Sequence, residues 1–205
     1  NRKHIGELNS FGLGFGTEEL AGHFIAGNDF NYTRTHVEAI RQAGFYNVVS
    51  CSADALPTVD ADDFACVDLI LGLERNDGRS LMPYKSFTPQ MQTWLAVYSR
   101  RGGRLFVSGA YVGSDMTSSN ETVFLNNVLK CRYAGIDTTP DAQLTGMGTT
   151  FAIYRQLNEQ HYAVPKTDIL QPDEGAFTPI AYADGYSAAV AYRDKNSRVF
   201  TMGFP

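Results

Sequence analysis

Residues 65–73 read Ala-Cys-Val-Asp-Leu-Ile-Leu-Gly-Leu, and residues 104–108 read Arg-Leu-Phe-Val-Ser. These two nearly continuous apolar runs are typical of strands that are buried on both faces of a parallel sheet. Between them, residues 88–99 carry four apolar side chains at helical spacing, namely Met91, Trp94, Leu95 and Tyr98. Thr88 is a favourable N-terminal cap and Pro89 suits the first helical position. The order strand, helix, strand predicts two neighbouring parallel strands.

The same alternation extends to both sides of this unit. Helical spacing predicts helices at residues 33–43 and 120–130, and an apolar run predicts a strand at residues 45–51. After Arg132 the pattern changes, and four strands are expected at residues 151–157, 177–182, 186–192 and 199–204. We therefore expect an α/β fold with a doubly wound, mostly parallel sheet and antiparallel strands added in the C-terminal third.

The length of the chain, 205 residues, suits a single hydrophobic core. Residues 1–27 contain six glycines and show neither helical nor strand periodicity. We expect these residues to form an irregular N-terminal segment. Residues 28–205 are expected to form one domain, a fragment of a longer chain.

Composition argues against several classes of function. The chain has 17 Lys and Arg residues against 22 Asp and Glu residues, and no basic run that would neutralise a row of phosphates. We therefore expect no nucleic-acid partner. No apolar run reaches the roughly 20 residues that span a bilayer, so no membrane span is expected in this chain. The three cysteines lack metal-binding spacing and the four histidines are scattered, so we expect no metal site and no cofactor.

Polar loops follow the two central apolar runs, and ligands bind outside the carboxyl ends of strands in an open parallel sheet. Ser108 or Ser114 is a candidate nucleophile and His36 the candidate base. Glu74 or Asp115 would be the orienting carboxylate of such a triad. Alternatively, Glu74 and Asp115 form a carboxylate pair for glycosidic chemistry. The Gly-x-Ser-x-Gly spacing of a nucleophile elbow is absent around Ser108.

Candidate ligand-binding residues come from the loops at 72–78 and 108–115 and from residues 28–33. They are Arg75, Asn76, Tyr111, Ser114, Asp29 and Tyr32. The simplest alternative is that short polar side chains in these loops cap helices and bond exposed backbone groups.

Several motifs taken together resemble one family. They are Asp68-Leu-Ile-Leu-Gly72, Gly102-Gly-Arg-Leu-Phe-Val-Ser-Gly109 and Arg198-Val-Phe-Thr-Met-Gly-Phe-Pro205, along with residues 26–33. The set resembles Bacteroidetes xanthan lyase-type proteins with a class I glutamine amidotransferase-like, flavodoxin-like domain. The resemblance covers residues 26–115 and 186–205.

This resemblance implies a carbohydrate-related protein that is secreted, periplasmic or at the cell surface. Active amidotransferases carry a catalytic Cys on the turn after a central strand and a His after a late strand. Here Ser108 follows the strand and Phe204 stands where the His would be. The resemblance thus implies a domain that lacks both catalytic groups and does not hydrolyse glutamine.

We therefore expect a non-catalytic accessory or binding domain whose partners are carbohydrate and other domains of the longer protein. The alternative is a hydrolase or lyase that acts on a glycan or a peptidoglycan-like substrate. A purely structural module is the third interpretation.

Overall fold

A computed structural model describes residues 32–75, 85–140, 143–156 and 163–205. The expected irregular segment at residues 1–27 lies outside the described residues. Two of the candidate binding residues, Asp29 and Asn76, also lie outside them.

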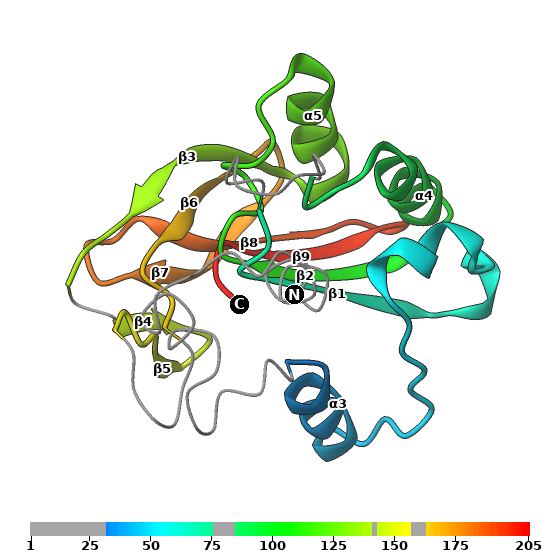
Figure 1. Ribbon diagram of the computed structural model, residues 1–205, viewed down its shortest axis with the longest axis horizontal. Helices are drawn as coiled ribbons and strands as arrows, with labels where there is room; N and C mark the ends of the chain where they lie inside the picture. Colours follow the sequence, from blue (N-terminus) through cyan, green and yellow to red (C-terminus); the bar gives the residue numbers. More distant parts are fainter. Residues whose placement is uncertain (1–31, 76–84, 141–142, 157–162) are drawn as a thin grey trace, which may run out of the picture.

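A seven-stranded mixed sheet forms the body of the molecule (Figure 1). Its strands, in spatial order, are β1 (Cys66–Gly72), β2 (Arg104–Gly109), β9 (Arg198–Met202), β8 (Ser187–Arg193), β7 (Phe177–Tyr182), β4 (Gln143–Gly146) and β5 (Thr149–Ala152). Only β1, β2 and β9 run parallel to one another, and every other pair in the sheet is antiparallel. A second antiparallel pair, β3 (Cys131–Asp137) and β6 (Thr167–Pro172), lies beside β8.

Few helices accompany this sheet among the described residues. α3 (Tyr32–Gln42) lies on one side of it, and α4 (Pro89–Arg100) and α5 (Ser119–Phe124) lie on the other (Figure 1). A π-helical turn, Leu125–Leu129, continues α5. Two short 3-10 helices, Ala53–Thr58 and Ala61–Asp63, lie between α3 and β1.

The expectation of a doubly wound, mostly parallel α/β sheet is wrong. The sheet is mixed, curled and mostly antiparallel. A parallel crossover needs a dozen or more residues, whereas tight turns join the later strands. Met147 and Gly148 have φ of +50° and +78° between β4 and β5, and Gly185 has +88° between β7 and β8. The flavodoxin-like, amidotransferase-like fold that the resemblance implied therefore finds no support.

The predicted helix at residues 88–99 is confirmed as α4. The Thr88 hydroxyl accepts a hydrogen bond from the Met91 N–H, as an N-terminal cap should. The Trp94 indole donates to the Val59 carbonyl at 2.8 Å, and the Tyr98 hydroxyl donates to the Phe64 carbonyl at 2.9 Å. These two bonds fix the segment between α3 and β1 against the helix.

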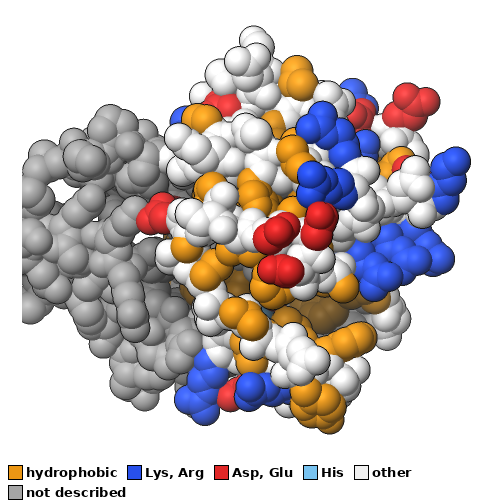
Figure 2. Space-filling view, turned by 90° about the vertical axis from the view of Figure 1, so that its right-hand side faces the viewer, with side chains coloured by type: hydrophobic (Ala, Val, Ile, Leu, Met, Phe, Trp, Pro, Cys, Tyr) orange, Lys and Arg blue, Asp and Glu red, His pale blue; other side chains and the backbone are white. Residues whose placement is uncertain are grey.

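The predicted strand at residues 45–51 is wrong. This segment has no regular structure, and Phe45, Tyr46 and Val49 are exposed. A strand needs a neighbour for its backbone hydrogen bonds, and no described strand pairs with this segment. Figure 2 shows hydrophobic side chains around a hollow on the side of the molecule along which the segment runs.

The described residues form two hydrophobic clusters. One lies under α4 and α5 and contains Leu95, Leu105 and Val107. The other includes Leu144 and Ile180 of the antiparallel strands, with Phe106 and Phe200 packed against it. Residues 105, 106 and 107 of β2 therefore serve the two clusters alternately, as the period of a strand requires.

Leu95→Ala should destabilise the protein by about 2–5 kcal/mol, because Leu95 is completely buried and its loss leaves a cavity. Urea unfolding followed by circular dichroism measures this change. Val123→Ala is the control, since Val123 is exposed on α5 and its truncation should cost less than about 0.5 kcal/mol. Equal losses in the two variants would contradict the assignment of Leu95 to the core.

A buried ion pair joins the two-stranded sheet to the chain that follows β5. The Arg155 guanidinium bonds the carboxylate of Asp137, which is 2% exposed. Arg155 also donates to the Val164 carbonyl at 3.2 Å and the Thr167 hydroxyl at 3.1 Å. One side chain thus contacts β3, β6 and the segment between β5 and β6.

Arg155→Ala should cost about 3–5 kcal/mol, because it leaves the Asp137 carboxylate buried without its counter-ion. The matched control is Arg101→Ala, which breaks the exposed pair with Asp62 and should cost less than about 1 kcal/mol. Chemical denaturation of both variants at neutral pH compares the two losses. A small effect of Arg155→Ala would show that the ion pair does not stabilise the contact between the two-stranded sheet and the chain that follows β5.

Candidate functional site

The carboxyl ends of the three parallel strands meet at one edge of the sheet. The Ala110 N–H donates to the Gly72 carbonyl at 2.8 Å, and the Gly109 N–H donates to the Phe204 carbonyl at 3.1 Å. The loops at this edge carry Glu74, Arg75, Tyr111, Ser114 and Asp115 of the predicted site residues.

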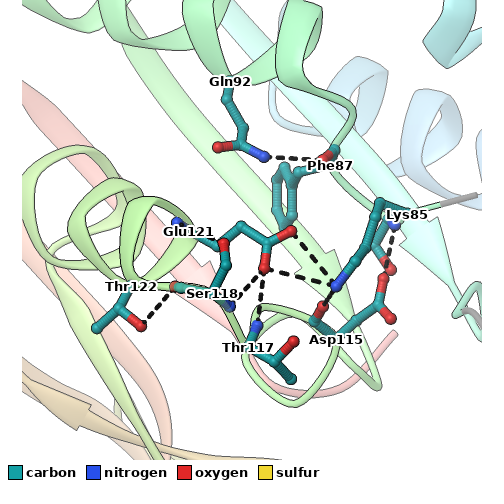
Figure 3. Close-up of polar contacts among 9 residues, drawn as sticks. Lys85, Phe87, Gln92, Asp115, Thr117, Ser118, Glu121 and Thr122 are labelled. Atoms are coloured by element: carbon teal, nitrogen blue, oxygen red, sulfur yellow. Dashed lines mark hydrogen bonds and ion pairs between the residues drawn. The ribbon is translucent and has the colours of Figure 1, made fainter.

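Asp115 connects the loops at this edge. Its carboxylate is buried and accepts a hydrogen bond from the Ser86 N–H at 2.8 Å. The Ser86 hydroxyl in turn donates to the Glu74 carbonyl at 2.9 Å. The Lys85 ammonium group donates to the Asp115 carbonyl and pairs with Glu121 at 3.3 Å (Figure 3). These contacts fix the segment at residues 85–86 against the turn after β2.

Glu121 anchors the start of α5 from the same network. Its carboxylate accepts from the N–H groups of Thr117 and Ser118 at 2.9 and 2.8 Å, forming a capping box with Ser118 (Figure 3). Burial raises the pKa of Glu121, but the hydrogen bonds from Ser118, Lys85 and Thr117 outweigh it, so the pKa lies below its ordinary value. This carboxylate is therefore ionised at neutral pH and serves the helix.

Ser108 and His36 do not form a catalytic pair in this structure. Ser108 is completely buried, and its hydroxyl has no hydrogen-bonding partner within the described parts of the chain. His36 Nδ1 is hydrogen-bonded instead to the Asp68 carboxylate at 2.8 Å, and the His36 and Phe106 rings make a T-shaped contact. Ser108 lies two residues beyond Phe106 on β2, roughly 7 Å further along the strand. A nucleophile and its base must lie within hydrogen-bonding distance of each other. The structure does not place Ser108 and His36 in this way, so their catalytic roles stay predictions.

Among the described members of the predicted binding set, Arg75 is the exposed one. Its guanidinium lies 4.6 Å from the centre of the Tyr111 ring, and Arg75 is exposed whereas Tyr111 is buried. Burial raises the pKa of Tyr111, so its hydroxyl stays neutral. Tyr32 packs against Gly72 at the end of β1, where a Cβ atom would come within 2.9 Å of the Tyr32 ring. Tyr111 and Tyr32 therefore support this edge, and Arg75 projects from it.

Asp168 of β6 is a site residue that the sequence did not reveal. Its carboxylate accepts from the N–H groups of Gly113 and Ser114 at 2.7 and 2.8 Å. Burial raises the pKa of Asp168 to about 6, against the opposing effect of these hydrogen bonds. The only signal in the sequence is one acidic residue beside the apolar pair Ile169 and Leu170.

Other kinds of site receive no support within the described residues. No group of three His, Cys, Asp or Glu side chains among them is arranged to hold a metal ion. Within the same residues, no helix has the length and apolar character needed to cross a membrane. A shallow cavity of about 370 Å³ lies at residues 44–47, away from the strand ends.

Comparisons with known proteins show similarity of fold only. The chain matches no protein-family profile and no curated protein. The cytoplasmic protein STM1381 from Salmonella typhimurium LT2 shares its fold, with a TM-score of 0.54 and 14% identity over 83% of this chain and 75% of that one. At this identity the likeness does not extend to chemistry.

Two larger enzymes align less well. The exo-beta-1,4-mannosidase Op5Man5 from Opitutaceae bacterium strain TAV5 has a TM-score of 0.45 and 9% identity over 71% of this chain. The beta-galactosidase from Rahnella sp. R3 has a TM-score of 0.44 and 14% identity over 72% of this chain. The chain spans only 21% of the length of each enzyme. None of these comparisons supports the resemblance to xanthan lyase-type proteins or glutamine amidotransferases.

Asp115→Ala should lower the free energy of unfolding by about 1–3 kcal/mol, because the buried Ser86 N–H loses its acceptor. Asp115→Asn keeps an oxygen at the same position and should retain most of that stability. Urea denaturation of the two variants separates the effects. If the alanine variant proves as stable as the asparagine variant, Asp115 does not connect these loops.

Proposed function

We propose that this chain is a non-catalytic binding domain of a carbohydrate-related protein that is secreted, periplasmic or at the cell surface. The observation that carries the proposal is that the acidic side chains at the strand ends are engaged in hydrogen bonds within this chain. Asp115, Asp168 and Glu121 each hold backbone N–H groups of this chain. Such groups stabilise loops and leave little free for reaction.

The interior position of Ser108 argues in the same direction. A nucleophile must meet its substrate, but Ser108, on β2 between β1 and β9, is completely buried. The described residues give it no base, since His36 is hydrogen-bonded to Asp68 instead. A ligand would reach Ser108 only if the groups that cover it moved.

Arg75 is the group best placed to meet a ligand. The Tyr111 ring holds its guanidinium in position, which reduces the conformational entropy that binding would cost. A guanidinium donates several hydrogen bonds and suits the carboxylate or hydroxyl groups of a sugar. The carbohydrate class itself is suggested by the sequence resemblance at residues 26–115 and 186–205. The proposed partners are a glycan and other domains of a longer protein.

A glycan array probed with the folded chain, followed by mass spectrometry of each bound glycan, tests the proposal. We expect binding without cleavage products. Arg75→Ala should weaken that binding about tenfold or more, because a hydrogen bond to a charged group is lost. Arg101→Ala is the control, because Arg101 is also exposed but follows α4, away from the strand ends.

Each other outcome speaks against the proposal. Cleavage that is lost in Ser108→Ala, Glu74→Gln or Asp115→Asn would favour the hydrolase or lyase alternative. No binding by a chain shown to be folded would favour a structural module. Equal binding by the two arginine variants would show that Arg75 does not take part in binding.

A further inference from the structure

The turn after β2, residues 110–116, is held by a side chain of the same protein. The N–H groups of Gly113 and Ser114 both point at one carboxylate oxygen of Asp168, at 2.7 and 2.8 Å. Successive backbone N–H groups of this kind form a concave site that binds anions. Here the anion is supplied by β6, from a residue 54 or 55 positions further along the chain.

The surroundings of Asp168 are unfavourable for a negative charge. The side chain is completely buried, and its second oxygen, Oδ1, has no hydrogen-bonding partner among the described residues. The titratable groups that face it are Asp115 and Tyr111 of the turn, Cys131 and Tyr133 of β3, and Tyr182 of β7. None of these groups carries a positive charge, so the two N–H groups and the Ser114 side chain are the main compensation for the buried carboxylate.

We propose that Asp168 is a pH-dependent latch on the turn at residues 110–116, which acid closes more tightly and neutral pH loosens. The latch is a property of the turn and does not depend on glycan binding. Because the turn carries Tyr111, Ser114 and Asp115, its opening would change the edge from which Arg75 projects.

The direction of the pH dependence follows from the difference in the pKa of Asp168 between the closed and the open turn. In the closed turn, burial raises the pKa of Asp168 to about 6. When the turn opens, water reaches the carboxyl group and the pKa returns toward its ordinary value of 3.8. Protons therefore bind the closed form more tightly, and this stabilisation is lost as the pH rises through 6. The opening equilibrium should increase roughly tenfold between about pH 5 and pH 8.

Amide hydrogen exchange of the full chain, followed by NMR, measures this opening directly. We expect the protection factors of the Gly113 and Ser114 amides to fall roughly tenfold from about pH 5 to pH 8. The Val164 amide, bonded to the Tyr154 carbonyl at 2.7 Å, is an internal control and should change little. In Asp168→Asn the amide oxygen still accepts the two bonds but does not titrate, so the same protection factors should be independent of pH.

Two results would overturn the latch. One is protection of Gly113 and Ser114 that is constant or rises with pH in the unmodified protein. The other is an equal fall in Asp168→Asn. If that variant does not fold, the carbon-13 shift of the Asp168 carboxyl group decides in the unmodified protein. Titration near pH 6 together with the loss of protection supports the latch, and titration near its ordinary value excludes it.

Discussion

The arrangement of this protein depends on β9, which pairs in parallel with β2 and antiparallel with β8. This strand joins the three parallel strands to the antiparallel remainder of the sheet. Val199 and Thr201 are buried on the side of α4 and α5, and the Thr201 hydroxyl donates to the Leu129 carbonyl at 3.1 Å. Residues close to the C-terminal end of the sequence thus contact the middle of the chain, and neither half of the sheet is complete without them.

Buried carboxylates connect the loops, as β9 connects the two parts of the sheet. Asp115, Asp137 and Asp168 are each buried, and each links segments that are distant in the sequence. An isolated buried charge is costly, so each one is stabilised by N–H groups or by a guanidinium. Of these three residues, only Asp115 was a candidate catalytic residue in the sequence, and its carboxylate accepts the Ser86 N–H at the edge of the sheet. The burial of Asp168 is the basis of its proposed sensitivity to pH.

The candidate site was predictable in part. The rule that ligands bind at the carboxyl ends of parallel strands placed Glu74, Arg75, Tyr111, Ser114 and Asp115 at one edge, and the structure brings them together there. The rule says nothing about burial, so it did not separate exposed Arg75 from the sealed hydroxyl of Ser108. It also missed Asp168, because β6 pairs with β3 outside the main sheet and its contact with the turn spans more than 50 residues.

Local periodicity determined α4, β1 and β2. A helix with one buried face and a strand buried on both faces each have a characteristic pattern of apolar side chains in consecutive residues. It failed for residues 45–51, which have the composition of a strand but no described neighbour to pair with. Only the tertiary structure decided the direction of the later strands, the pairing of β3 with β6 and the roles of the buried carboxylates. These features depend on contacts between distant residues, and local sequence patterns do not specify which distant groups will meet.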